Sequence, residues 1–388
     1  MRIDSIEIFH LALPLVEPLP VTRGPGERLE TVLLAMHSGG ATGWGEASPG
    51  NAPCVGSEWA AGAFALLRDW LAPAIAGQSV SSGEELSKSL AGFRGNQFAK
   101  AALDTAWWDL QARMQDRPLH ALLGVPGSAC GREESAEAGT AIADAIEVGA
   151  TFDQMDSIES LRAAIERAVA QGITRVKLKF RPGWDVRMVD FVRKEFPLLD
   201  LAVDCEGALN LGQTDMLYRL EDFSLETIEQ PFPADDLVGH AMIQQSLRTS
   251  ICLDESIATV AQAEMAIELQ SCKQMNLKPG RVGGLTAAVA IHDLCHEACI
   301  PCYVGAMPQT TIGARHGLAL ASMPNCRRPA DYLPHSELLA DDVAEPLRPA
   351  KDNDGRLRVP LWSSPGIGVE PDRAKLEKFC IAKATLPI

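Results

Sequence analysis

Five polar residues recur at a nearly constant interval in the second half of this 388-residue chain. Each ends a short apolar segment that is typical of a buried β-strand, such as "TRVKLKF" or "LDLAVDC". They are Lys179, Asp204, Glu229, Asp254 and Lys278, which lie 25, 25, 25 and 24 residues apart. One strand–helix unit takes about that length, because a (β/α)8 barrel of ~250 residues contains eight of them. The interval predicts parallel strands, in a sheet that is open or closed into a barrel, with the five residues at their carboxyl ends. In barrels, catalytic groups gather at that rim.

Two lysines share one face of the first of these strands. Because strand side chains alternate, Lys177 and Lys179 point the same way, about 7 Å apart, while Val176, Leu178 and Phe180 point the other way. An isolated pair of this kind would indicate a solvated edge, but the register with the other polar strand ends favours the interior. Burial and a neighbouring ammonium both lower the pKa of a lysine. We therefore predict that Lys177 lowers the pKa of Lys179, which then acts as a base near neutral pH.

The three acidic strand ends predict a metal site. Asp204, Glu229 and Asp254 would converge from adjacent strands, where carboxylates must repel one another or bind a cation. Hard oxygen ligands that leave room for substrate suit Mg²⁺, with Mn²⁺ as a second possibility. Lys179 would approach from one side and Lys278 from the other. A metal between two bases indicates abstraction of a proton α to a carboxylate.

The first part of the chain has a different pattern. Residues 3–13, 30–38 and 43–48 alternate as strands do, and the pattern from residue 58 to residue 123 is helical, most clearly in the amphipathic segment "AKAALDTAWWDLQARM". This mixture indicates an α+β domain over residues 1–125. We assign residues 126–345 to the strand–helix repeat, as the catalytic domain. The Pro- and Gly-rich residues 346–388 are expected to return to the N-terminal domain.

Composition limits the partners of the protein. The net charge of −16 and the pI near 5.0 disfavour nucleic acid and anionic membranes. No apolar run approaches the ~18 residues that span a bilayer, and the first residues lack a signal-peptide pattern. The ten cysteines are scattered without the spacing of a disulfide framework, so reduced thiols in a cytoplasm are expected. We expect a small carboxylate substrate and a homo-oligomer.

One further cluster of metal-ligating residue types has a structural explanation. His292, Cys295, His296 and Cys299 would share one face of a helix. Four ligands on a single helix cannot close a tetrahedron around one zinc ion. We interpret them as the buried stripe of that helix.

Several motifs together resemble a known family. "VKLKF", "VDCEG", "IEQPF", "LDES" and "NLKPGRVGG" occur in the order and spacing of the muconate-lactonising subgroup of the enolase superfamily. Within that subgroup, "KPGRVGG" and "FRGNQFAKAALDTAWWDLQARMQDRPLHALLG" are most similar to o-succinylbenzoate synthases and N-succinylamino acid racemases. The resemblance extends from about residue 3 to the C-terminus.

The resemblance implies a fold and a site. The fold would be a modified (β/α)7β barrel with an N-terminal α+β capping domain. Mg²⁺ would lie on Asp204, Glu229 and Asp254, with Lys179 and Lys278 as the acid/base pair. The Gly/Pro-rich segment "VTRGPGERL", which contains Arg23, would correspond to a substrate loop.

Two positions depart from the family pattern. Members usually carry Asn two residues after the first metal carboxylate, where this chain has Glu206. We expect Glu206 to reach the metal directly or through water, or to pair with a lysine. Relatives tend to have "GGMLE" after the seventh strand, where this chain has "GAMPQ", ending at Gln309. That segment is expected to approach the substrate.

The predicted function is a syn-dehydration that yields o-succinylbenzoate for menaquinone synthesis. Lys179 would remove the α-proton, and Lys278 would stabilise the enediolate as a cation. The alternative is racemisation of N-succinyl or other N-acyl amino acids, in which both lysines act in turn. Dipeptide epimerases typically carry Asp-x-Asp at the eighth strand, where "ADYLP" offers Asp331 alone. A non-catalytic role is disfavoured because the set of lysines and carboxylates is intact.

Overall fold

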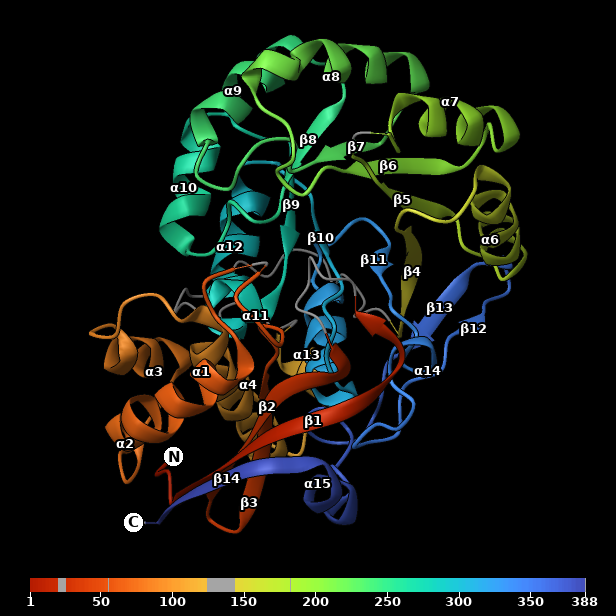
Figure 1. Cartoon of the computed structure of the whole chain (residues 1–388). Helices are drawn as coiled ribbons and strands as arrows, with labels where there is room; N and C mark the ends of the chain where they lie inside the picture. Colours follow the sequence, from red (N-terminus) through yellow and green to blue (C-terminus); the bar gives the residue numbers. More distant parts are fainter. Residues whose placement is uncertain (20–25, 55, 124–143, 182, 388) are drawn as a thin grey trace.

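The computed structural model describes residues 1–19, 26–54, 56–123, 144–181 and 183–387. Arg23, which the family resemblance places in a substrate loop, lies outside these residues. Figure 1 shows a smaller part that contains both chain ends and a larger part in which helices surround a ring of strands.

The smaller part is built on an antiparallel sheet with the strand order β14-β1-β2-β3. Its strands are β1 (Ser5–Leu19), β2 (Gly26–Ser38), β3 (Ala41–Ala47) and β14 (Cys380–Pro387). Its helical segments are α1 (Ala60–Leu66), η2 (Leu67–Leu71), α2 (Ala72–Ile75), α3 (Gly83–Leu90), α4 (Gln97–Met114) and α5 (Leu119–Leu123). Alternation along β1 places Ile6 and Ile8 in the core and leaves Glu7 partly exposed.

Helix α4 lies between this sheet and the barrel. The sequence pattern predicts an amphipathic helix, which is wrong, because most of its residues are buried on every side. Its backbone approaches β3 closely at two glycines. A Cβ atom on Gly43 would lie 2.2 Å from the Ala106 carbonyl oxygen, and one on Gly45 would lie 2.0 Å from that of Ala102. Larger residues at these glycines would therefore force the helix away from the sheet.

The larger part consists of seven strand–helix units and a final strand. The strands are β4 (Ala145–Phe152), β5 (Arg175–Lys179), β6 (Asp200–Asp204), β7 (Thr227–Glu229), β8 (Ser250–Leu253), β9 (Gln274–Leu277), β10 (Cys302–Val304) and β11 (Ala330–Asp331). The helices that follow β4 to β10 are α6 (Ile158–Ala170), α7 (Val186–Glu195), α8 (Thr214–Leu220), α9 (Leu237–Ser246), α10 (Val260–Glu268), α12 (Leu285–Glu297) and α13 (Thr311–Ala321), with the short α11 (Pro279–Val282) before α12. Neighbouring strands from β4 to β10 pair in parallel, and β11 pairs in parallel with β4. The predicted (β/α)7β barrel with an α+β capping domain is confirmed.

The last part of the chain contacts both domains. Strand β13 (Leu357–Pro360) pairs with β4 of the barrel and with β12 (Ala350–Lys351). After helix α15 (Arg373–Phe379), strand β14 pairs with β1 of the capping sheet. The predicted return to the N-terminal domain therefore corresponds to β14, and the residue limits of the three segments stay a prediction.

Buried carboxylates of the capping domain accept hydrogen bonds from helix N-termini of the barrel. Asp104 of α4 accepts the backbone N–H of Thr286, at 3.1 Å, and its hydroxyl, in the first turn of α12. Glu46 of β3 accepts the N–H and hydroxyl of Thr310 and the N–H of Gly313 at the start of α13, at 2.6–3.0 Å. Helix N-termini have unpaired N–H groups and favour negative charge, so these contacts join the domains. Burial raises the pKa of both carboxyls, that of Asp104 to about 7.

The helix with four metal-ligating residue types is only half buried along that stripe. His292 and Cys295 are buried in α12, whereas His296 and Cys299 are exposed. Cys299 lies beyond the last residue of α12, with a φ of +57°. The predicted continuous stripe is therefore wrong at its C-terminal end. The nine cysteines among the described residues are free thiols.

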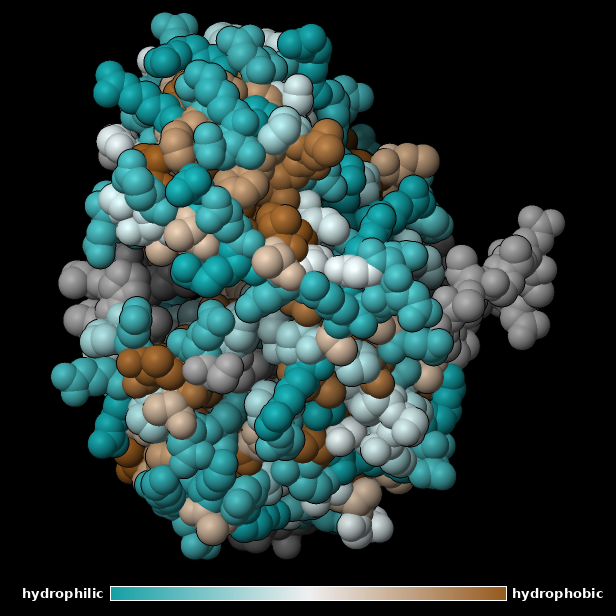
Figure 2. Space-filling view, turned by 90° about the vertical axis from the view of Figure 1, so that its right-hand side faces the viewer, coloured by the Kyte–Doolittle hydropathy of each residue, from teal (hydrophilic) through white to brown (hydrophobic). Residues whose placement is uncertain are grey.

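Hydrophilic residues dominate the face of the molecule seen in Figure 2, and an apolar patch lies in its upper half. None of the helices in the described ranges is long and apolar enough to cross a membrane.

Replacing Asp104 by Asn should reduce the pH dependence of stability. The pKa of Asp104 is about 7 in the folded protein, against an ordinary value of 3.8. The folded state therefore binds a proton that the unfolded state has released, and wild-type stability falls as the pH rises from about 4 to about 7, by a few kcal/mol. The amide side chain of Asp104→Asn cannot ionise, so the unfolding free energy of this variant should fall less over this pH interval than that of the wild type. This holds even if weaker hydrogen bonds make the variant less stable at every pH. Urea unfolding at several pH values measures how the unfolding free energy of each protein changes with pH. The same change in the wild type and the variant would contradict the role of Asp104.

Candidate active site

The barrel brings the five recurring polar residues to one rim. Lys179 is in register with Asp204 across β5 and β6, and Asp204 is in register with Glu229 across β6 and β7. Asp254 and Lys278 directly follow β8 and β9. All five side chains belong to residues that are at most 8% exposed. Consecutive parallel strands thus place two lysines at the ends of an arc of three carboxylates.

A cavity of about 300 Å³ opens above this arc, between the two domains. The capping domain contributes Leu29, Ser48, Pro49 and Gly50 to its wall. The barrel contributes Thr151, Asp153, Lys177, Lys179, Asp204, Glu206, Asp254, Glu255, Lys278, Arg281, Ala306, Met307, Pro308, Asp331, Tyr332 and Leu333. One side of the cavity is therefore charged, and the residues after β10 and β11 add apolar side chains.

The two outer lysines each pair with a carboxylate of the arc. The Lys179 ammonium donates to Asp204 Oδ2 at 2.8 Å, and the Lys278 ammonium donates to Asp254 Oδ2 at 2.6 Å. Arg281 also contacts Asp254, at the other carboxylate oxygen. Although burial alone would raise the pKa values of Asp204 and Asp254, these cations lower both. The two carboxyls are therefore ionised at neutral pH.

Lys177 lies deeper than Lys179 and pairs with three carboxylates. Its ammonium is 2.6 Å from Asp331, 3.1 Å from Glu229 and 3.5 Å from Asp204. Burial opposes its charge, but these carboxylates raise its pKa well above the ordinary value. Lys177 is thus a permanent cation that neutralises the carboxylate arc from below. Its predicted effect on the pKa of Lys179 stays a prediction.

Glu229 is the most enclosed carboxylate of the arc, with no exposed surface. It accepts hydrogen bonds from Lys177 at 3.1 Å, from Asn276 Nδ2 at 2.9 Å and from the Tyr303 hydroxyl. Burial and repulsion by Asp204 raise its pKa to about 7. This carboxyl would therefore gain from an additional nearby cation.

The contacts of Glu229 with Asn276 and Tyr303 do not follow from the interval that predicts the arc. Asn276 lies two residues before Lys278, so strand alternation places both on one side of β9. Tyr303 is a polar residue within the apolar strand β10. The same period of two, applied to the interior of each strand, would have indicated both residues.

A second group of buried charges lies below the arc. Asp331 accepts from Arg175 at 2.9 Å and pairs with Lys177. Arg175 is 1% exposed, donates to Glu226 at 2.7 Å and stacks over the Tyr303 ring at 4.6 Å. These ion pairs occupy the carboxylate of Asp331.

Glu206 lies beside Lys179 at the mouth of the cavity. Its two oxygens accept from Lys179 at 2.6 Å and from Arg181 at 3.0 Å, and Arg181 also pairs with Asp153 at 3.1 Å. Its φ of +48° is in the left-handed region, which is uncommon for a residue other than glycine. The expected pairing of Glu206 with a lysine is present, and its expected approach to the metal stays a prediction.

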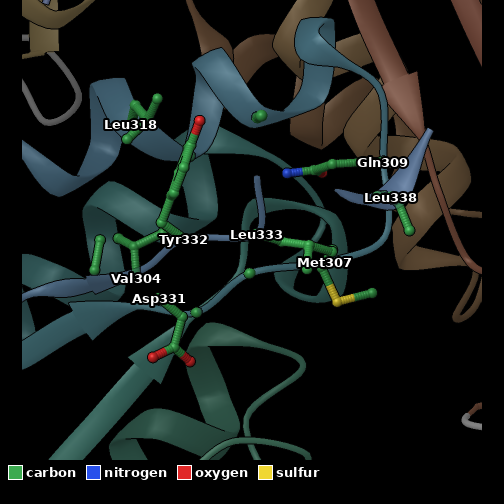
Figure 3. A pocket seen from close by; sticks show the side chains of 13 residues that line it. Val304, Met307, Gln309, Leu318, Asp331, Tyr332, Leu333 and Leu338 are labelled. Atoms are coloured by element: carbon green, nitrogen blue, oxygen red, sulfur yellow. The ribbon is translucent and has the colours of Figure 1, made fainter. Parts of the chain in front are cut away.

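Gln309 lines a side chamber of about 40 Å³ that adjoins the cavity (Figure 3). Ala306, Met307, Asp331, Tyr332 and Leu333 border both spaces. The rest of the chamber wall consists of Val304, Gly305, Ala314, Gly317, Leu318, Ala330 and Leu338. The chamber is therefore mostly apolar.

Comparison with known proteins identifies the family. Residues 4–124 match the mandelate racemase / muconate lactonizing enzyme N-terminal domain, and residues 160–375 match the enolase C-terminal domain-like family. The chain belongs to the enolase superfamily. It is 37% identical to o-succinylbenzoate synthase of Geobacillus stearothermophilus, over 98% of this chain and 96% of the relative. It is 36% identical to N-succinylamino acid racemase of Thermus thermophilus, over 95% of both chains.

Solved structures give the same family. An enolase-superfamily member from Enterococcus faecalis V583 has a TM-score of 0.89 and 31% identity, with 99% of both chains covered. Muconate lactonizing enzyme from Pseudomonas putida has a TM-score of 0.82 at 23% identity, over 97% of this chain and 99% of that one, which supports the fold alone.

The residue types of this enolase-superfamily site fit a divalent metal. Asp204, Glu229 and Asp254 offer the hard oxygen donors that Mg²⁺ prefers. Within the described ranges, no three His, Cys, Asp or Glu side chains cluster as metal ligands, and lysine ammonium groups pair with all three of these carboxylates. Burial, and then repulsion by Asp204, raise the pKa of Glu229, and a cation beside this carboxylate would oppose both effects.

Asp331→Ala should destabilise the barrel strongly. The substitution removes the carboxylate that Lys177 and Arg175 share, and both cations stay buried. Removing one partner of a buried ion pair typically lowers the unfolding free energy by about 3–5 kcal/mol. Urea unfolding of the variant and the wild type gives the difference. Asp190→Ala, which breaks an exposed ion pair with Lys194, is the control and should have a much smaller effect. Similar losses in the two variants would show that Asp331 does not compensate buried charge.

Proposed function

We propose that this enolase-superfamily protein abstracts a proton α to a carboxylate, and that its reaction is the dehydration that yields o-succinylbenzoate for menaquinone synthesis. The observation that carries the proposal is the pair of lysines, Lys179 and Lys278, at opposite ends of the carboxylate arc. Identities of 37% and 34% to two curated o-succinylbenzoate synthases, each over 98% of the chain, support it.

Each residue of the arc has a distinct part in this proposal. Asp204, Glu229 and Asp254 would hold Mg²⁺ or Mn²⁺, which supplies stabilisation of the negative charge of an enediolate. Lys179 Nζ takes the α-proton and returns it to the hydroxyl that leaves as water, so the reaction needs a base on one face only. Lys278 stays protonated on the other side and balances the developing negative charge.

The cavity suits a small carboxylate substrate with an apolar body. Its lining includes the cations Lys179, Lys278 and Arg281 and the apolar side chains of Leu29, Met307 and Leu333. The net charge of −16 favours a small molecule over nucleic acid or an anionic membrane as the partner. We also propose a homo-oligomeric protein of the cytoplasm.

The side chamber favours N-succinylamino acid racemisation as a second function. A racemase substrate carries a variable side chain, and the chamber offers a small apolar space next to the cavity. Curated racemases match this chain over nearly its whole length. Dipeptide epimerisation lacks such support, because the carboxylate of Asp331 is already paired with Arg175 and Lys177.

Arginine variants of the two lysines should separate dehydration from racemisation. Arginine keeps the charge but is too weak a base. Lys278→Arg should therefore retain measurable dehydration of the o-succinylbenzoate precursor, whereas Lys179→Arg should not. The same preparations are assayed with N-succinyl amino acids in deuterium oxide. Equal loss of dehydration in both variants would refute the division of roles, and rapid exchange into both enantiomers by the wild type would establish the racemase.

Gly317→Ala should narrow substrate choice if the chamber holds a side chain. A Cβ atom at Gly317 would meet Val304 Cγ1 at 3.6 Å, an ordinary contact, and the residue lies in α13, where Ala is favoured over Gly. Racemisation of N-succinyl amino acids with larger side chains should fall relative to those with small ones, while dehydration stays within about twofold. Gly92→Ala, which meets nothing within 4 Å, is the matched control. If the ratio of racemisation rates for large and small side chains is unchanged, the chamber does not hold the substrate side chain.

A further inference from the structure

Tyr303 is a fully buried tyrosine whose hydroxyl lies inside the carboxylate arc. It belongs to β10 and has no exposed surface. Its hydroxyl donates to Glu229 Oε2 and accepts from the Lys177 ammonium at 3.2 Å. A buried phenol needs such partners, because an unpaired hydroxyl in the interior is costly. The contact joins β10 to β7, two strands that are not neighbours in the sheet.

The donors around Glu229 fix the orientation of its carboxylate. Asn276 donates to Oε1 at 2.9 Å, Tyr303 donates to Oε2, and Lys177 lies 3.1 Å from both oxygens. An ionised carboxylate offers about four acceptor positions, and these four contacts use them, two of them by Lys177. A metal ion on Glu229 would therefore take the place of a contact from Lys177, while Asn276 and Tyr303 could keep theirs. Two of the three donors are neutral. Neutral donors hold the group in place without adding positive charge that would repel a metal ion.

Tyr303 itself is held rigidly. The guanidinium of Arg175 lies 4.6 Å from the centre of the ring, and Arg175 is fixed by ion pairs with Glu226 and Asp331. The hydrogen bond to Glu229 therefore comes from a ring that its buried neighbours hold in place.

We propose that Tyr303 is a positioning residue for metal binding: its hydroxyl orients the Glu229 carboxylate toward the metal ion. This inference rests on the proposed function, in which Glu229 is a metal ligand. Hydrogen bonds to metal-ligating carboxylates commonly change metal affinity by about 10–100-fold.

Tyr303→Phe tests the proposal, because it removes one oxygen and preserves the ring. Isothermal titration with Mg²⁺ and with Mn²⁺ should show about 10–100-fold weaker binding than in the wild type. Activity of the variant should recover as Mg²⁺ is raised, since mass action compensates for weaker binding. Tyr218→Phe is the control, because Tyr218 lies on α8 and is 45% exposed. If Tyr303→Phe binds both ions with an affinity within about twofold of that of the wild type, the inference is overturned.

A second measurement covers the case in which Tyr303→Phe does not fold. The chain has three tyrosines, so protein labelled with 3-fluorotyrosine gives three ¹⁹F resonances, which Tyr218→Phe and Tyr332→Phe assign. The Tyr303 resonance should shift on titration with Mg²⁺, and a constant resonance at saturation would overturn the inference.

Wild-type metal binding separates this inference from the proposed function. If the wild type binds Mg²⁺, Glu229→Gln does not, and Tyr303→Phe matches the wild type, only the role of Tyr303 fails. If the wild type binds neither ion, both the positioning role and the metal-dependent function fail.

Discussion

Charge that is buried without a partner is too costly for a folded protein to keep, and this constraint governs the barrel rim. Lys177, Lys179 and Lys278 are interleaved with carboxylates so that every one of them has an anionic neighbour. A shift of any strand by one residue would turn its charged side chain to the opposite face. The polar groups therefore fix the register of the strands, in addition to any chemistry that they perform.

The cavity depends equally on the contact between the two domains. Its wall contains Leu29 and Ser48 from the capping domain, which lie above the barrel rim only while the domains stay docked. Asp104 and Glu46 stabilise this contact between the domains, because they accept hydrogen bonds from backbone N–H groups at the starts of α12 and α13. Because the same two helices follow β9 and β10, the capping domain is anchored next to the strands that carry Lys278 and Tyr303.

Local periodicity predicts the parallel strand–helix repeat and its polar strand ends, whereas closure into a barrel is implied by the resemblance to the enolase superfamily. The interval of about 25 residues places Asp204, Glu229 and Asp254 on successive strands. Contacts across the barrel were not accessible in this way. Tyr303 reaches Glu229 from a strand that is distant in the sequence, so no local pattern reports the contact.

Other errors have similar physical causes. Helix α4 has polar residues that suggest an exposed face, yet Asp104 and Asp109 are buried, because each accepts hydrogen bonds from backbone N–H groups of distant segments. The stripe that begins at His292 was extended to Cys299 on helical spacing alone. The helix ends at Glu297, where the left-handed backbone of Cys299 turns the chain away.

The proposed dehydration and the proposed racemisation begin with the same step, removal of a proton α to a carboxylate, so the arc cannot by itself select between them. Selection must come from the walls that hold the rest of the substrate. Met307, Tyr332 and the side chamber with Gln309 form one such wall, and Glu206, to which Arg181 donates, belongs to another. Gln309 and Glu206 are also the positions at which the sequence departs from the pattern of related enzymes. The chemistry is thus encoded in the regular strand ends, while the choice of substrate is encoded in the irregular loops that follow them.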